Sequence, residues 1–401
     1  MIVGLVGKPN TGKSTFFSAA TLLTVQIENR PFTTIKPNRG VGFVRVPCVC
    51  RELGVEDEPV NSACVDGIRL IPVELVDCAG LVPDSWKGKG LGNYFLDEVR
   101  KADALIHLVD IAGSTDEEGR QTRPGMRDPL KDVEFLEREI VMWLRQILQK
   151  DWKKISQTVQ MTRKSLIDLL SDKLSGLAIK KTHVIEAVTK ADLDPGRPTE
   201  WDDGDLVRLA SHFQKIAKPM MIAANKIDLP YAESNITRLR EEGHIVYPCC
   251  AEAELILRRA TEGGLIEYTP GDSNFIVLKP NALTEEQKGA LEVIKERILR
   301  KWGTTGVQEA INAAFFRLLR MVTVYPVENV ERFCDHQGRV LPDAHLVPEG
   351  TRVKEFAHKI HSDLGSGFLY AVEARSKRRL GENYTLRNGD VVRIVSTKGR
   401  R

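Results

Sequence analysis

The sequence predicts a doubly wound α/β domain with a helical insertion, followed by a smaller module of short strands. Strand and helix patterns alternate through about residue 128. About a hundred residues then separate two strand candidates of that domain, which is far beyond an ordinary crossover connection. From residue 321 the pattern changes to short strands. We expect the α/β domain to span residues 1–128 and 218–320, the insertion 129–217, and the C-terminal module 321–401.

The chain starts with an apolar strand candidate, residues 1–6, that leads directly into Gly-Lys-Pro-Asn-Thr-Gly-Lys-Ser at 7–14. This is the phosphate-binding pattern GxxxxGK[ST], and a helix pattern follows from Lys13 to Leu23. Because strand, loop and helix occur in the required order, we favour a phosphate site over a chance glycine-rich turn. The expected nucleotide contacts are Gly7, Lys8, Pro9, Asn10, Thr11, Gly12, Lys13, Ser14 and Thr15.

The chemistry of a phosphate site explains these residue types. Gly7 and Gly12 let successive backbone N–H groups face phosphate oxygens, and the helix that begins at Lys13 adds its positive dipole. Lys13 would bridge the β- and γ-phosphates, and Ser14 would hold Mg²⁺. The strand candidate 70–76 ends in Asp-Cys-Ala-Gly. There Asp77 suits Mg²⁺ binding through water, and the Gly80 N–H suits the γ-phosphate.

A second motif indicates the base. The strand candidate 219–224 is followed by Asn225-Lys226-Ile227-Asp228. The Asp228 carboxylate can accept from both guanine donors, the ring N–H and the exocyclic amine, whereas adenine has no ring N–H at that position. Asn225 would tie this loop to the phosphate loop, and the stem of Lys226 would cover the base. The sequence therefore predicts GTP and GDP as ligands.

Composition is that of an ordinary globular chain of 401 residues, with 42% hydrophobic and 28% charged residues. No apolar stretch approaches the length of a membrane span. The first strand candidate starts at Met1, so we expect no signal or transit peptide and no membrane partner. Seven cysteines, an odd number, indicate free thiols in a reducing compartment. The expected location is cytoplasmic.

One group of cysteines allows two interpretations. Cys48 and Cys50 flank a single valine, and Cys64 follows 14 residues later. These thiols could bind a metal, but the spacing is not the usual CxxC pair and no histidine lies nearby. We therefore expect packed free thiols.

Charge is distributed unevenly along the chain. The net charge is +3, yet residues 351–401 carry 12 Lys and Arg against 5 Asp and Glu, which leaves −4 on the preceding 350 residues. A basic C-terminal module on a mildly acidic body suggests an anionic partner, and a solvated charged surface is the alternative. The sequence does not predict an oligomeric state.

Helical periodicity dominates the insertion. Apolar residues recur at three- and four-residue spacing from Val133 to Leu148 and from Leu166 to Leu174, Asp194-Pro195-Gly196 breaks the pattern, and 205–216 is amphipathic. The insertion could be an arm for a partner or could simply pack on the body. Further helices are expected at 284–302, with a capping box at Thr284 and Gln287, and at 306–319.

The C-terminal module shows strand candidates at 322–326, 340–341, 368–372 and 391–395. A helix candidate covers 353–363, and Asn388-Gly389-Asp390 is a turn before the last strand.

Together these motifs resemble the Obg-related GTPases of the YchF-like branch. Beyond the phosphate loop, the resemblance rests on Asn-Arg-Pro-Phe-Thr-Thr at 29–34, Asp-Cys-Ala-Gly-Leu-Val at 77–82 and Gly-Lys-Gly-Leu-Gly-Asn-Tyr-Phe-Leu at 88–96. It covers nearly the whole chain. Proteins of the YchF type proper lack a regular NKxD and favour ATP. Because Asn-Lys-Ile-Asp is intact here, the resemblance implies a GTP-preferring relative. It also places Cys250, Ala251 and Glu252 where guanine-binding proteins have a Ser-Ala-Lys loop that contacts the base mainly through its backbone.

The same resemblance bears on catalysis. We expect Lys13, Thr34 and Gly80 to act on the phosphates, and Ser14, Thr34 and Asp77 to hold Mg²⁺, with Thr33 as the alternative to Thr34. Leu81 stands where Ras-type enzymes place a water-orienting Gln, so either another group positions the water or hydrolysis is slow until a partner assists. We do not expect Asp84 or His107 to replace this Gln, because both are interpreted as structural or surface residues. Asn10 occupies a position where some GTPases that lack the Gln hold K⁺, and we hypothesise that K⁺ raises turnover more than Na⁺.

The C-terminal module resembles a TGS domain, a ubiquitin-like β-grasp module, through residues 346–353 and 386–392. Similar modules in threonyl-tRNA synthetase and stringent-response enzymes imply association with ribosome or RNA, and a docking domain is the rival interpretation. Three functions follow: a GTP-hydrolysing switch that engages ribosome or RNA, an ATPase of the same fold, or a nucleotide-gated binding protein with negligible turnover.

Overall fold

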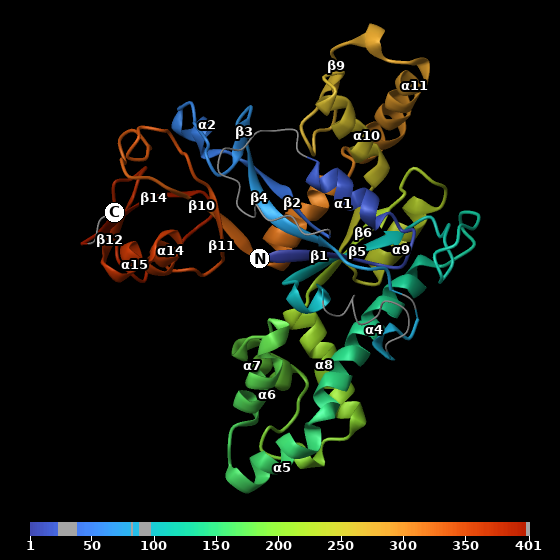
Figure 1. Ribbon diagram of the computed structural model, residues 1–401, viewed down its shortest axis with the longest axis vertical. Coiled ribbons are helices and arrows are strands. Elements are labelled where there is room, and N and C mark those ends of the chain that lie inside the picture. The colour runs from blue at the N-terminus through green and yellow to red at the C-terminus, as the bar shows by residue number, and fades with distance from the viewer. Residues whose placement is uncertain (23–37, 82, 88–97, 398–401) are drawn as a thin grey trace. The chain divides into compact units, whose positions relative to one another are not determined.

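The computed structural model describes residues 1–22, 38–81, 83–87 and 98–397 (Figure 1). The described chain divides into two compact units. The first contains residues 1–22, 38–40 and, apart from the gaps just given, 74–310; the second contains residues 41–73 and 311–397. The predicted Mg²⁺ ligand Thr34, its alternative Thr33, the rest of the segment 30–36 and the loop residues 88–93 lie outside the described residues.

Most strands of a mainly parallel sheet belong to the first unit. Its strand order is β2-β4-β1-β5-β6-β7, and the last five strands pair in parallel. Leu5 pairs with Asp77, and Asn225 lies between Asp110 and Cys249. The carboxyl ends of these strands therefore meet at one edge, where open α/β sheets bind ligands. The strand bounds are Ile2–Val6 (β1), Arg39–Pro47 (β2), Ile68–Asp77 (β4), Ala104–Asp110 (β5), Met220–Asn225 (β6) and Val246–Cys249 (β7).

Helices follow the strands as the sequence predicts. α1 covers Lys13–Thr21, two residues shorter than expected. The capping box at α11 is present, because the Thr284 N–H donates to Gln287 Oε1 at 3.0 Å and the Gln287 N–H to Thr284 Oγ1 at 3.2 Å. The remaining elements outside the insertion are α9 (Ala232–Glu241), α10 (Ala251–Glu262), the hairpin β8 (Ile266–Glu267) and β9 (Ile276–Val277), α11 (Glu285–Val293), a π-helical stretch Ile294–Leu299 and α12 (Arg300–Trp302).

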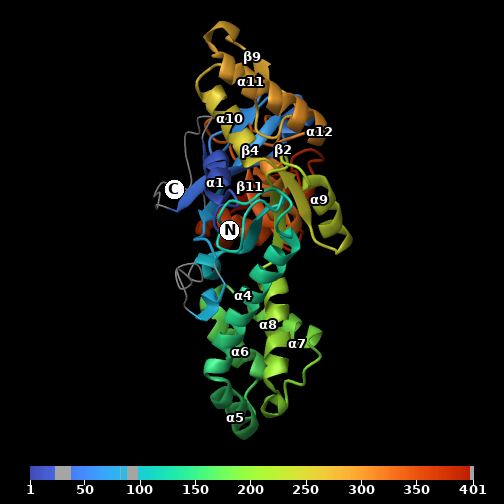
Figure 2. The same ribbon diagram turned by 90° about the vertical axis from the view of Figure 1, so that its right-hand side faces the viewer.

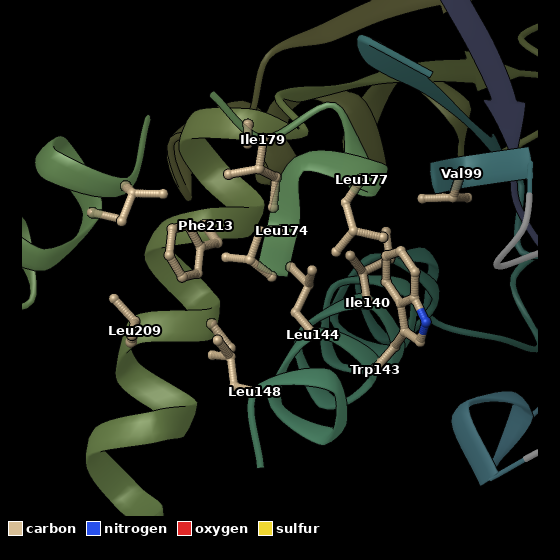
Figure 3. Packing of buried hydrophobic residues seen from close by; sticks show 14 of the residues in the cluster. Val99, Ile140, Trp143, Leu144, Leu148, Leu174, Leu177, Ile179, Leu209 and Phe213 are labelled. Atoms are coloured by element: carbon tan, nitrogen blue, oxygen red, sulfur yellow. The ribbon is translucent and has the colours of Figure 1, made fainter. Parts of the chain in front are cut away.

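Five α-helices account for the predicted helical segment: α4 (Pro129–Lys150), α5 (Trp152–Thr162), α6 (Leu166–Leu174), α7 (Lys181–Lys190) and α8 (Asp203–Ala217). Figures 1 and 2 show α4 and α8 running alongside one another. The apolar stripe predicted from periodicity is the buried face: Ile140, Leu144 and Leu148 of α4 pack with Leu174 of α6 and Phe213 of α8 (Figure 3). Each such side chain contributes about 1.5–3 kcal/mol by its burial.

The second unit contains a five-stranded mixed sheet in the order β11-β10-β14-β12-β13. Val353 and Phe356 of α14 pack on it against Val324 and Val392, which is the arrangement of a β-grasp fold. The element bounds are α13 (Val307–Ala313), whose first residues belong to the first unit, a π-helical stretch Ala314–Leu318, β10 (Met321–Pro326), β11 (His345–Pro348), α14 (Val353–Ile360), α15 (Ser362–Ser366), β12 (Phe368–Glu373), β13 (Arg379–Leu380) and β14 (Asp390–Ser396).

One predicted strand is wrong. Val340 and Leu341 form no strand; Val340 makes only an isolated bridge to Cys334, and Leu341 has a left-handed φ of 45°. The backbone at 340–342 instead bonds to residues 58–60 of the same unit. The N–H groups of Glu58 and Val60 donate to the carbonyl groups of Val340 and Pro342 at 2.8 and 2.7 Å. The strand is β11, a few residues later.

Residues 41–73 of the second unit also carry α2 (Val49–Leu53) and β3 (Ala63–Val65), which forms a hairpin with the start of β4. Across the part of the chain that the structure describes, no helix combines the length and the apolar character needed to cross a membrane.

Candidate nucleotide-binding site

The phosphate loop has a backbone that requires glycine at two positions. Gly7 and Gly12 have φ values of +147° and +95°, which side chains rarely tolerate. A Cβ at Gly7 would lie 2.5 Å from the carbonyl oxygen of Leu108, and one at Gly12 would collide with the Asn225 amide. The loop is therefore closed in on both sides, and it leads straight into α1, whose first N–H groups have no intrahelical partner.

Lys13 is a buried cation at the base of this loop. Its ammonium donates to the carbonyl oxygen of Lys8 at 2.7 Å. Burial lowers the pKa of Lys13 to about 8, although the carboxylate of Asp77 acts in the opposite direction. A buried ammonium with a depressed pKa is stabilised by any anion that enters, which is what a phosphate site requires.

Ser14 and Asp77 form the candidate Mg²⁺ position. The Ser14 hydroxyl donates to Asp77 Oδ2 at 3.0 Å. Asp77 Oδ1 is buried and has no hydrogen-bond partner within the described chain, and burial raises the pKa of this carboxyl. A hydroxyl beside an unpartnered carboxylate oxygen matches the oxygen ligands that Mg²⁺ takes, so the residues fit this ion.

Asn225 joins three loops. Its side-chain N–H donates to the carbonyl oxygen of Thr11 at 2.8 Å, and its Oδ1 accepts from the Ala251 N–H at 3.0 Å. The residue is buried at the carboxyl end of β6. The structure thus brings the phosphate loop, the Asn-Lys-Ile-Asp loop and the start of α10 together, as the sequence pattern requires.

Asp228 is exposed at the rim of this arrangement. Its Oδ1 lies 3.5 Å from the Cys250 thiol. The N–H groups of Cys250 and Ala251 already donate, to Thr305 at 2.8 Å and to Asn225. A contact from this loop to a base would therefore share the Ala251 N–H or use that of Glu252 in the first turn of α10.

Asp110 is a site residue that the sequence reasoning missed. It is fully buried at the end of β5, and its Oδ2 accepts from the hydroxyls of Ser114 and Thr115 at 2.7 and 2.9 Å. The same oxygen lies 3.0 Å from the Lys226 ammonium. Lys226 has a left-handed φ of 69°, so this ion pair also fixes an unusual backbone position. The signal was present in the sequence, because a carboxylate that ends a central parallel strand lies at the ligand edge.

A loop between β5 and α4 braces the phosphate loop, which was also not predicted. The Lys8 ammonium donates to the Thr115 carbonyl at 2.8 Å and pairs with Asp132 at 2.7 Å. The Asn10 amide donates to the Gly119 carbonyl at 2.8 Å. The side chains of Lys8 and Asn10 thus bind protein, and their contribution to phosphate binding would come from the backbone.

The residues after the Asp-Cys-Ala-Gly motif are anchored to the helical part of the unit. Glu139 of α4, 5% exposed, accepts from the backbone N–H groups of Asp84 and Trp86 at 3.0 and 2.9 Å. Leu81 is buried, and its N–H donates to the Gly7 carbonyl at 3.2 Å. His107 is buried in β5, and burial lowers its pKa to about 3. As neutral, enclosed groups, Leu81 and His107 are structural.

Three family profiles match the chain. They are described as a 50S ribosome-binding GTPase over residues 2–146, the G4 motif-containing domain of Obg-like GTPases of the YGR210-like type over 223–329, and a TGS domain over 337–396. Together they cover the phosphate loop, the Asn-Lys-Ile-Asp loop and the β-grasp sheet.

Similar proteins extend along the whole chain. An uncharacterized GTP-binding protein of Methanocaldococcus jannaschii is 48% identical, over 98% of this chain and 99% of its own. The crystal structure of a GTP-binding protein from Pyrococcus horikoshii superimposes with a TM-score of 0.80 at 42% identity, covering 99% and 100% of the two chains. A protein of Bacillus subtilis named ribosome-binding ATPase YchF is 25% identical over 98% of each chain. The chain belongs to the Obg-like, YchF-type family of P-loop GTPases that carry a C-terminal TGS domain.

Proposed function

We propose that the protein is a switch that binds GTP in preference to ATP, hydrolyses it to GDP and phosphate, and engages the ribosome or RNA according to its nucleotide state. The observation that carries this proposal is the position of Asn225, which holds the loop of Asp228 against the phosphate loop. The loop that would read the base and the loop that would hold phosphate therefore follow strands of one sheet at the same edge.

Base preference would come from Asp228. Its exposed carboxylate has room to accept from the two adjacent donors of guanine. Adenine has no ring N–H there, and a carboxylate left unpaired under a bound base costs several kcal/mol. The related YchF proteins are named ATPases, so the ATPase interpretation is the alternative, and the intact motif is the feature that separates this chain from it.

The chain's own residues would act on the phosphates by position and charge. Backbone N–H groups of residues 7–14 and the ammonium of Lys13 would hold the phosphate oxygens. Ser14 and Asp77 would hold Mg²⁺, which neutralises charge on the β- and γ-phosphates when bound. Gly80 would offer its N–H to the γ-phosphate, and Thr34, outside the described residues, would complete the metal site.

Slow intrinsic turnover is part of this proposal. Leu81 carries no hydrogen-bonding group and is buried, and His107 is enclosed. Neither can orient a water, so we expect hydrolysis to depend on a partner. K⁺ bound at Asn10 would be one source of help. Its amide N–H is committed to Gly119, which leaves its carbonyl oxygen for a cation.

The partner surface would be the C-terminal module and the helical insertion. Lys377, Arg378 and Arg379 are consecutive and exposed. Such a cluster suits phosphate oxygens of RNA. Glu139 offers a route from the nucleotide to the insertion helices, because it holds the loop after Asp-Cys-Ala-Gly on α4.

Single-turnover hydrolysis of GTP, measured with and without ribosomes, tests the proposal. We expect a slow rate that ribosomes increase and that is higher in KCl than in NaCl at equal ionic strength. Tight GTP binding without hydrolysis under any of these conditions would favour a nucleotide-gated binding protein instead. Equal rates in the two salts would remove K⁺ from the proposal and leave the remainder.

A further inference from the structure

Four potential metal ligands converge in the second unit, and none of them has a role in the candidate nucleotide-binding site. They are Cys48, Cys50, Asp57 and Cys64, and their ligand atoms all lie within 4.8 Å of one another. Cys48 and Cys50 are buried, and Asp57 is 10% exposed. From these positions we propose that the four side chains form a binding site for one Zn²⁺ ion, independent of the nucleotide.

The separations match a tetrahedral zinc site. With Zn–S bonds of about 2.3 Å, two thiolates on one ion lie roughly 3.8 Å apart, and a thiolate and a carboxylate oxygen lie roughly 3.5 Å apart. The Sγ atoms of Cys50 and Cys64 are 3.9 Å apart, and Cys48 Sγ is 3.2 Å from Asp57 Oδ2. These two separations lie within a few tenths of an ångström of the tetrahedral values, and no pair of the four atoms is more than 4.8 Å apart.

The ligands come from separate elements that are fastened to each other. Cys48 follows β2 and precedes α2, Cys50 lies in the first turn of α2, and Cys64 lies in β3. The Cys48 N–H donates to the carbonyl of Gly67 at 2.8 Å, which ties this corner to the β3–β4 hairpin. A site held by a corner and a hairpin can exist before the metal binds.

The surroundings supply what such a site needs around its ligands. Arg69 is fully buried, and its Nη1 lies 2.6 Å from Asp57 Oδ2. It orients the carboxylate and offsets one of the four negative charges that the deprotonated ligands would carry. The Tyr325 hydroxyl is buried beside the Cys48 thiol. A Cys48 thiolate on Zn²⁺ would be a stronger acceptor for this hydroxyl than a neutral thiol.

The sequence favoured packed thiols here, because Cys-x-Cys with a third cysteine 14 residues later is not a usual zinc pattern. The missing ligand was Asp57, which no local spacing points to. The fold brings it to the thiols, with its carboxylate paired to Arg69.

Metal content of the untagged full-length protein tests the proposal. The protein is purified reduced and without chelator, and zinc is counted by mass spectrometry. We expect about one Zn²⁺ per chain. Replacement by Co²⁺ should give thiolate-to-cobalt charge-transfer bands and tetrahedral visible bands, with release of thiol protons on binding. The oxygen ligands proposed at Ser14 and Asp77 cannot produce thiolate bands, so failure of the nucleotide site would not be mistaken for failure of this one.

Variants locate the ion. Cys50→Ser and Cys64→Ser should each abolish the cobalt bands, and Asp57→Asn should weaken Zn²⁺ binding by about tenfold or more. Cys334→Ser, which removes another buried thiol of the same unit, should leave the metal content unchanged. Reduced wild-type protein that takes up neither ion, or takes up Co²⁺ without charge-transfer bands, would overturn the proposal in favour of packed thiols. The wild-type measurement decides even if a variant fails to fold.

Discussion

The side-chain amide of Asn225 donates to the carbonyl oxygen of Thr11 at 2.8 Å, across 214 residues of sequence. The other end of the same amide accepts from the Ala251 N–H. One buried side chain therefore sets the distance between the loop that would hold phosphate and the loop that would read the base. Gly12 permits this approach, since a Cβ there would collide with the amide.

The first prediction concerns this amide. Asn225→Ala should weaken GTP binding by roughly 10- to 100-fold, because it leaves a buried carbonyl and a buried N–H without partners at about 1–3 kcal/mol each, part of which appears as protein stability. Isothermal titration measures the affinity and thermal unfolding the stability. Asn235→Ala is the matched control, because it removes a side-chain bond of the same length, to the Ile111 carbonyl, outside the phosphate loop. Equal effects of the two variants would contradict the role given to Asn225.

The second prediction follows from the pKa of Lys13, which burial lowers to about 8. Bound phosphate favours the charged form and raises this pKa, so above pH 8 binding must take up a proton. GDP affinity should be nearly constant from pH 7 to 8 and should then fall with rising pH, by up to about tenfold per unit. Lys13→Arg, which stays charged, should bind without this slope. The contribution of Lys13 to the stability of the nucleotide-free protein should instead increase above pH 8, because the unfolded chain then binds more protons than the folded chain.

The third prediction concerns Asp110 and Lys226. Asp110→Asn removes the buried carboxylate that lies 3.0 Å from the Lys226 ammonium and accepts from Ser114 and Thr115. Breaking a buried pair costs roughly 3–5 kcal/mol, and because Lys226 is partly exposed we expect about 2 kcal/mol of destabilisation. Denaturant unfolding measures this, and GTP binding should weaken as the Lys226 loop loosens. Glu118→Gln provides the control, since Glu118 forms an exposed ion pair with Arg120. A variant as stable as this control would contradict the assignment.

The fourth prediction concerns RNA. Neutralising Lys377, Arg378 and Arg379 together should weaken binding to ribosomal RNA and reduce the magnitude of its logarithmic salt slope by about 2. GTP affinity should be unchanged. The matched control neutralises Lys295, Arg297 and Arg300, three exposed cations on and after the π-helical stretch that follows α11. Salt-insensitive binding, or equal losses in both triple variants, would favour a docking domain. Equal RNA binding with GDP and with a non-hydrolysable GTP analogue would keep RNA as the partner but exclude control of its binding by the nucleotide.

Much of the candidate nucleotide site could be predicted because its backbone geometry is local. Residues 7–14 lie between a strand and a helix, and their glycines allow the positive φ values of this loop. Asn-Lys-Ile-Asp follows a strand that the apolar pattern identifies. The apolar stripe from Val133 to Leu148 was predictable for the same reason. Its residues recur at helical spacing and form the buried face of α4.

The rest depends on contacts between distant segments. Asp110 pairs with Lys226, 116 residues later, and Glu139 accepts from Asp84 and Trp86, 55 and 53 residues earlier, so the spacing of residues does not predict these contacts. Val340 and Leu341 have the composition of a strand but are held by backbone bonds to residues 58–60. Tertiary hydrogen bonding overrides local propensity at such positions.

Competition of GTP and ATP for the wild-type protein and for Asp228→Asn shows whether Asp228 sets the base preference. GTP should bind about a hundredfold or more tightly than ATP, and Asp228→Asn should remove most of this preference by weakening GTP binding alone. Glu252→Gln, which changes a neighbouring exposed carboxylate, should preserve the preference. Equal affinities of the wild-type protein for GTP and ATP, or an Asp228→Asn variant with unaltered GTP affinity, would contradict this role of Asp228.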